Sequence, residues 1–162
     1  MNKNEIYEFI KSKNIWYQVY EHKAVYNMEE LDSLDLPYKD SDAKNLFLRD
    51  DKKKNYYLVI LKGDKKVDLK KFRKNNNLRN LSFASTSDLY DILNLMPGSV
   101  SPLGLLNDNE LKVILYIDSE LLLNDGIIGV HPCDNTATIF LYVNDLINII
   151  KEHGNEVIIQ KI

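Results

Sequence analysis

The spacing of apolar residues changes along the chain between the period of a helix and the period of a strand. Ile6, Phe9 and Ile10 follow one another as on one face of a helix, and Asn2 with Glu5 is typical of a capping box. The sequence therefore predicts a first helix over residues 2–14. Similar patterns predict further helices at residues 27–36, 68–74, 85–94 and 143–154.

Strands are predicted where apolar and polar residues alternate or where short apolar runs occur. Residues 44–49 and 55–61 enclose the polar segment DDKKK, which indicates a hairpin. The other expected strands cover residues 16–22, 81–84, 112–118, 127–130, 137–142 and 156–162. Because helices and strands intermix along the chain without repeats, the predicted fold class is α/β or α+β with a mixed sheet.

The length of 162 residues, of which 44% are hydrophobic, is enough for one sizeable core and predicts a single domain over residues 1–162. No apolar run approaches the ~20 residues that cross a bilayer. The first residues carry acids where a signal peptide has an apolar stretch. We therefore expect a soluble, cytoplasmic protein with no membrane partner. The one cysteine, Cys133, cannot form an internal disulfide, which fits a reducing compartment.

Charge is distributed unevenly, although the net charge is only −3. Residues 44–79 contain 13 Lys or Arg against 4 Asp or Glu, whereas the rest of the chain contains 8 against 20. Such a basic segment is typical of a polyanion-binding surface, but a solvated lysine-rich face has the same composition. Aromatic residues do not interleave with these lysines as a base-stacking surface would require. The charge pattern alone leaves both interpretations open.

The segment PGSVSPLG, residues 97–104, combines glycine and proline with small hydroxyl residues. Gly98 and Gly104 permit backbone conformations in which N–H groups turn toward a ligand, so this loop is a candidate cradle for an anion or a carbonyl oxygen. An ordinary connecting turn has the same composition. The glycines form neither a dinucleotide-binding fingerprint nor a phosphate-binding loop. We expect no cofactor.

The segment GVHPCDNTATIFL places His131 and Cys133 at the start of an apolar run. A neutral His131 imidazole could donate to a substrate oxygen or satisfy a backbone carbonyl. A nucleophilic Cys133 is disfavoured, because nothing nearby in sequence lowers its pKa and the acid that follows would raise it. A metal site is not expected, because the further histidines, His22 and His153, are distant in sequence.

Taken together, these segments resemble the family of freestanding prolyl-tRNA editing domains, which is related to the editing insertion of bacterial prolyl-tRNA synthetase and to the YbaK deacylases. KNLFLRDDKKKNYYLVIL, MPGSVSPLGLLND and HPCDNTATIFL follow the family's order and spacing, so the resemblance covers nearly the whole chain. GSVSP matches the family's Gly-x-x-x-Pro loop, Lys44 its functional lysine, and His131 the histidine of its His-Pro-x-x-Asn-x-Ala-Thr segment. Cys133 departs from the pattern, where an apolar residue such as leucine is expected.

The resemblance implies a mixed, curved β-sheet flanked by helices and an enzyme that hydrolyses alanine wrongly attached to proline tRNA. An aminoacyl ester is already activated toward water, so such an enzyme needs mainly orientation and stabilisation of a tetrahedral oxyanion. The residues implied as catalytic are Lys44, Gly98, Ser99, Val100, Ser101 and His131. Those implied in substrate binding are Asn45, Pro102, Pro132 and Asn135, and Lys52, Lys53 and Lys54 are implied as a tRNA surface.

In this hypothesis backbone amides around residues 98–101 hold the carbonyl oxygen, and His131 lines the aminoacyl pocket. Lys44 and Asn45 anchor the terminal adenosine or its phosphate. The expected partner is the acceptor end of proline tRNA, and DNA is not expected to bind. Whether a prolyl-tRNA synthetase takes part stays open. The alternatives are a YbaK-type Cys-tRNA(Pro) deacylase, a non-catalytic module that binds aminoacyl-tRNA or a synthetase, and a small-molecule esterase that uses Cys133 or a serine.

Overall fold

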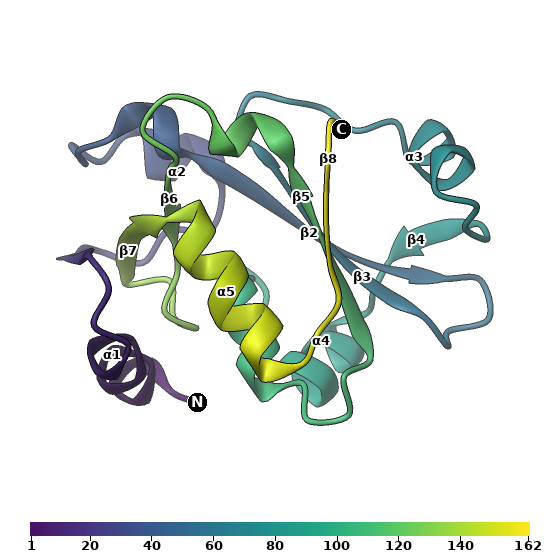
Figure 1. Cartoon of the computed structure of the whole chain (residues 1–162), viewed down its shortest axis with the longest axis horizontal. Helices are drawn as coiled ribbons and strands as arrows, with labels where there is room; N and C mark the ends of the chain where they lie inside the picture. The colour runs from purple at the N-terminus through teal and green to yellow at the C-terminus, as the bar shows by residue number, and fades with distance from the viewer.

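The computed structural model describes residues 1–162 and contains two β-sheets with helices packed around them (Figure 1). The larger sheet has five strands in the order β4–β2–β3–β5–β8. These strands are β2 (Ala43–Asp50), β3 (Tyr56–Lys62), β4 (Leu81–Phe83), β5 (Val113–Asp118) and β8 (Val157–Gln160). β2 pairs antiparallel with β3 and β4, whereas β3, β5 and β8 run parallel, so the sheet is mixed as predicted.

The smaller sheet consists of three antiparallel strands in the order β1–β7–β6. These strands are β1 (Tyr17–Glu21), β6 (Ile127–Val130) and β7 (Ala137–Tyr142). Each lies within a segment that the sequence predicts as a strand. The period of a strand identifies its buried face but not its partner, so the division into two sheets is information that the structure adds.

Local capping signals place most helices as predicted. α1 (Lys3–Ser12) begins after Asn2 and α4 (Thr86–Leu93) begins after Ser85, each with a complete capping box. α3 (Leu69–Asn75) begins after Asp68, whose side chain accepts hydrogen bonds from two amides. α5 (Val143–His153) ends at Gly154, which has a φ of +117°. None of the helices is long and apolar enough to span a membrane.

Three short 3-10 helices and a shortened α2 were not predicted. α2 (Met28–Asp32) is shorter than predicted, with Ser33 as its C-cap; Pro37 disfavours helical backbone only at Leu36, the residue before it. The 3-10 helices are η1 (Lys39–Ser41), η2 (Pro102–Asn107) and η3 (Ser119–Leu122). η2 occupies part of the segment expected to be a loop, and its apolar residues are buried. The burial of η2 anchors one end of the loop that precedes it, residues 98–101, which contains Gly98.

Alternation along β3 divides the buried residues between the two faces of the larger sheet. Leu58 and Ile60 belong to a cluster of 26 buried residues that includes those of α5, whereas Val59 and Leu61 belong to a second cluster with Phe72 of α3. α5 and α3 therefore cover opposite faces of this sheet (Figure 1). The first face continues to the start of β2, where β6 of the smaller sheet approaches it.

Candidate active site

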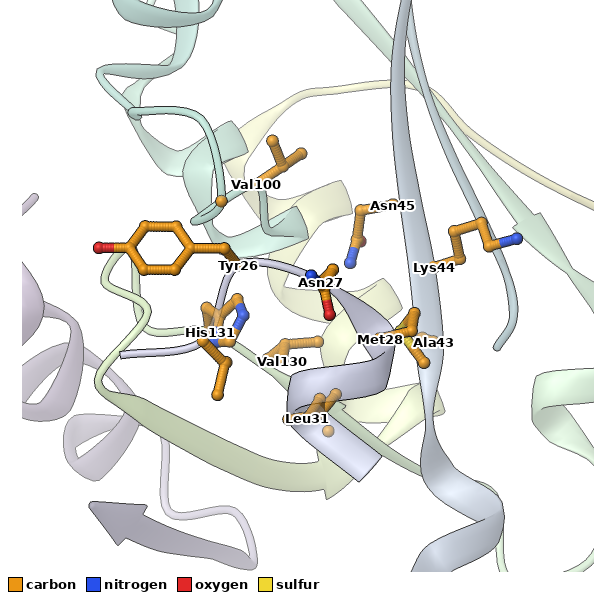
Figure 2. Close-up of a pocket in the computed structure, with 13 residues that line it drawn as sticks. Tyr26, Asn27, Met28, Leu31, Ala43, Lys44, Asn45, Val100, Val130 and His131 are labelled. Carbon is orange, nitrogen blue, oxygen red and sulfur yellow. The ribbon is translucent and has the colours of Figure 1, made fainter. Parts of the chain in front are cut away.

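A pocket of about 300 Å³ lies between the start of β2, the end of β6 and the segment that leads into α2 (Figure 2). This volume is at the lower end of the range for small-molecule sites. Four segments that are far apart in sequence contribute to it. The lining residues are Val25, Tyr26, Asn27, Met28, Leu31, Ala43, Lys44, Asn45, Gly98, Val100, Gly129, Val130 and His131.

The loop before η2 brings backbone donors to this pocket. Gly98 has a φ of +90°, a conformation that favours glycine. The amides of Gly98, Val100 and Ser101 donate to no acceptor within the chain, whereas Ser99 N donates to Met96 O at 3.1 Å. Gly98 and Val100 line the pocket. Unpaired amides in a glycine loop can bind an anion or a carbonyl oxygen, as predicted for this segment.

The two serine hydroxyls of this loop are used within the protein. Ser99 Oγ donates to the Met96 carbonyl at 2.8 Å, and Ser101 Oγ donates to the His131 carbonyl at 2.5 Å. Ser101 Oγ also accepts from Leu103 N at 3.2 Å. Both serines are buried, and neither lines the pocket. Their hydroxyls shape the loop and are not placed to attack a ligand in the pocket.

His131 brings an imidazole to the pocket wall. Its Nδ1 lies 3.0 Å from the Ala137 carbonyl, which can only accept, so Nδ1 carries the proton. Burial lowers the pKa of His131, and the ring is therefore neutral at pH 7 with Nε2 as an acceptor. Of the two roles considered from the sequence, the structure shows the second: the only ring proton is used on a backbone carbonyl, so His131 faces the pocket as an acceptor and not as a donor to a substrate oxygen.

Lys44 and Asn45 are neighbours on β2, so their side chains point to opposite faces of the sheet. Figure 2 shows the Asn45 side chain directed into the pocket and the Lys44 ammonium directed away from it. Lys44 Nζ donates to the Lys65 carbonyl at 2.8 Å. The Asn45 Oδ1 atom is buried and has no hydrogen-bond partner. A carboxamide oxygen that has no partner at a pocket wall can accept a hydrogen bond from a ligand.

The three other predicted substrate-binding residues support the pocket from outside. Asn135 Nδ2 donates to the Val25 carbonyl at 2.9 Å, and Val25 N donates to the Asn135 carbonyl at 3.2 Å. Pro102 is the first residue of η2, and Pro132 is buried directly after His131. None of the three lines the pocket. They fix the segments that do.

Cys133 is half-buried and packs against the larger core cluster. Burial raises the pKa of its thiol to about 11, so almost no thiolate exists at pH 7. The environment therefore agrees with the prediction that Cys133 is a structural residue. No group of three or more His, Cys, Asp or Glu side chains is arranged to hold a metal ion.

One wall of the pocket comes from residues 25–31, which the sequence analysis did not assign to the site. Asn27 caps α2 by accepting from Glu30 N at 2.8 Å, and the Glu30 carboxylate accepts from Tyr26 N at 2.9 Å. The Asn-x-x-Glu spacing is a capping signal that the sequence displays. The nearness of this cap to Gly98 depends on contacts between distant segments, for which a single sequence gives no signal.

Lys52, Lys53 and Lys54, hereafter the hairpin lysines, are exposed in the turn between β2 and β3. The turn begins beyond Asp50, which lies about 17 Å along β2 from Asn45 at the usual rise of a strand. An ion pair between Arg79 and Asp51 joins the segment after α3 to this turn. The hairpin lysines and α3 thus lie at one end of the molecule, and α2 and β6 lie at the other (Figure 1).

The pocket combines unpaired amides, a neutral histidine and a buried carboxamide, and it contains no activated side-chain nucleophile. These features suit the hydrolysis of an ester that is already reactive toward water. The chain belongs to the aminoacyl-tRNA editing domain family, which it matches over residues 22–149. This match confirms the class of protein that the motifs in the sequence indicate.

Several members of known identity resemble the chain over most of its length. It is 42% identical over 139 residues to the prolyl-tRNA editing protein ProX of Acetoanaerobium sticklandii, which covers 86% of this chain and 84% of that protein. It is 34% identical over 146 residues to the mouse prolyl-tRNA synthetase associated domain-containing protein 1, covering 88% and 85% of the two chains.

The fold is shared with a crystal structure of a candidate trans-editing enzyme for prolyl-tRNA synthetase. The TM-score is 0.71 with 18% sequence identity, over 97% of this chain and 95% of that one. The predicted fold class, a mixed sheet flanked by helices, is therefore confirmed.

Proposed function

We propose that this protein acts in trans to hydrolyse alanine from mischarged Ala-tRNA(Pro). The ProX relative is a prolyl-tRNA editing protein, which supports the proposal that the alanine is carried by tRNA(Pro). The observation that carries the proposal is the pair of unpaired amides, Gly98 and Val100, in the same pocket as the neutral His131. These groups match the needs of a tetrahedral oxyanion without a covalent intermediate.

In the proposed reaction the ester carbonyl oxygen accepts hydrogen bonds from the Gly98 and Val100 amides. Water attacks the carbonyl carbon and releases a proton to solvent, which later returns one to the ribose oxygen, and the amides stabilise the oxyanion that forms. The ester C–O bond then breaks, the ribose oxygen gains a proton, and alanine and free tRNA leave. His131 Nε2 accepts from the α-ammonium of the alanyl group, while the vicinal ribose hydroxyl helps to place the water.

Pocket size provides the proposed discrimination between alanine and proline. Met28, Leu31 and Val130 contribute apolar side chains to the lining. A proline ring is larger than the alanine methyl group, so a pocket matched to alanine rejects proline by steric overlap. Cysteine is closer to alanine in size, and a YbaK-type activity on Cys-tRNA(Pro) is therefore the second candidate function.

The proposed tRNA contacts are Lys44 near the 3′ end and the hairpin lysines further along the acceptor stem. For Lys44 to reach a phosphate, its ammonium must exchange the Lys65 carbonyl for the phosphate oxygen. The hairpin lysines are too far from the pocket to touch the terminal nucleotide, so their contacts fall on the stem. A prolyl-tRNA synthetase would be an additional partner and is not required for the chemistry.

The deciding experiment measures ester loss from Ala-tRNA(Pro), Pro-tRNA(Pro) and Cys-tRNA(Pro) at enzyme excess. Loss of alanine alone is expected. Loss of cysteine alone would replace the proposal with the YbaK-type activity, and tight binding without ester loss would leave a non-catalytic module. Hydrolysis of simple esters with none of the charged tRNAs would indicate a small-molecule esterase.

Lys44 is tested with the variants Lys44→Ala and Lys44→Met, because methionine keeps an unbranched apolar side chain and removes the charge. Both variants should lose activity if the ammonium contacts the 3′ end. A contact that strengthens in the transition state lowers kcat and kcat/KM together, whereas a contact that serves binding alone raises KM. Wild-type single-turnover rates at subsaturating enzyme would remove Lys44 from the site.

A further inference from the structure

Tyr26 is an exposed aromatic residue at the rim of the candidate active site. It lines the pocket, yet 66% of its surface is exposed. Its ring lies against the glycine loop, because a Cβ on Gly98 would be only 3.0 Å from Tyr26 Cδ1. Figure 2 shows the ring at the mouth of the pocket with its hydroxyl directed away from it. The ring therefore has one side against the loop and a large surface open to a ligand.

The backbone that carries this ring is held firmly. Tyr26 N donates to the Glu30 carboxylate at 2.9 Å, and the preceding residue, Val25, exchanges two hydrogen bonds with Asn135. A side chain that is exposed on a fixed backbone adds little to the core. Packing within the chain therefore does not account for a large aromatic ring at this position.

The chemical structure of the proposed substrate brings a flat base, the terminal adenine of the tRNA, close to Tyr26. A tRNA ends in an unpaired adenosine whose ribose carries the aminoacyl ester. In the proposed reaction the Gly98 and Val100 amides hold the ester carbonyl, and a single ribose joins this ester to the adenine, so the base has to lie within about the length of one ribose from these amides, which Tyr26 adjoins. Tyr26 is the residue with an open aromatic face on that loop. Unpaired RNA bases commonly stack on such side chains.

We propose that Tyr26 stacks on the terminal adenine of the tRNA and positions the 3′ end over the pocket. This inference rests on the proposed function, because it takes the aminoacyl ester as the group held by the amides. Stacking contributes equally to the ground state and the transition state, so Tyr26 is a positioning residue whose loss raises KM and leaves kcat nearly unchanged.

The test compares Tyr26→Ala, Tyr26→Leu and Tyr26→Phe in the hydrolysis of Ala-tRNA(Pro). Tyr26→Ala and Tyr26→Leu should raise KM roughly 5- to 150-fold, which corresponds to the usual contribution of one stacked base, while Tyr26→Phe keeps wild-type kinetics. Tyr90→Ala is the matched control, because Tyr90 is 57% exposed on α4 and does not line the pocket. Circular dichroism and thermal unfolding check that each variant folds.

A second measurement uses a minihelix that ends in a stable alanylamido analogue, prepared with and without the terminal adenine. Removing the base should weaken binding to the wild type and leave binding to Tyr26→Ala unchanged. Equal effects of base removal on the two proteins would overturn the stacking inference, as would a Tyr26→Leu variant with wild-type KM. No turnover of Ala-tRNA(Pro) by the wild type would instead overturn the proposed function and this inference with it.

Discussion

The substitution Gly98→Ala tests whether backbone amides hold the substrate carbonyl. Gly98 has a φ of +90°, and a Cβ there would meet Tyr26 Cδ1 at 3.0 Å. A non-glycine residue in this region is strained by about 1–3 kcal/mol. The loop can relieve this strain by rotating its peptide groups, which turns the Gly98 and Val100 amides away from the carbonyl. Loss of one such donor lowers the rate by about 10²–10³, so we expect a decrease of that size in single-turnover deacylation.

Gly126→Ala is the matched control for this prediction. Gly126 has a φ of +61°, and a Cβ there would meet only the Leu122 carbonyl at 3.6 Å. The control should therefore lose a similar free energy of unfolding, measured in urea, and keep wild-type deacylation, because Gly126 does not line the pocket. If Gly98→Ala deacylates as fast as Gly126→Ala, the amide cradle is wrong.

Three further predictions concern charge, the thiol and the half-buried acid Asp42. Replacing all three hairpin lysines with glutamine should weaken tRNA binding and reduce the slope of log Kd against log salt by up to about one unit per lost phosphate contact; an unchanged slope would make them a solvated turn. Cys133→Ala should keep deacylation close to wild type, because burial raises the pKa of the thiol to about 11; a loss of several orders of magnitude in a folded variant would contradict a mechanism without a thiolate. The pKa of Asp42 is raised to about 6 by burial and by Asp32. The folded state therefore retains a proton that the unfolded state releases near pH 4, and native stability falls as the pH rises toward 6. Asp42→Asn should be more stable than the wild type at pH 7.5, by about 1 kcal/mol after solvent screening, and equally stable near pH 3. Urea unfolding at both pH values measures this, and equal stability at pH 7.5 would disprove it.

Features that depend on neighbouring residues could be predicted from the sequence. The capping residues Asn2 and Ser85 mark the starts of two helices, and the glycine loop could be proposed as an amide cradle from its composition. The pocket wall that contains Tyr26 could not be predicted from the sequence, because its position depends on packing between segments that are distant in sequence. The opposite directions of Lys44 and Asn45 could have been predicted, since adjacent residues of a strand point to opposite faces.

The hydrogen bonds that join the pocket segments to one another also limit how the site can change in evolution or design. Ser101 is bonded to the His131 carbonyl, and Asn135 is bonded to the Val25 carbonyl, so three segments share one network. Substitutions in different segments should therefore be strongly non-additive, in contrast to those at separate sites. Both acceptors are backbone carbonyls, so a transplant of this pocket into a relative with other substrate preferences would have to carry the two donor side chains, Ser101 and Asn135, to keep the three segments joined.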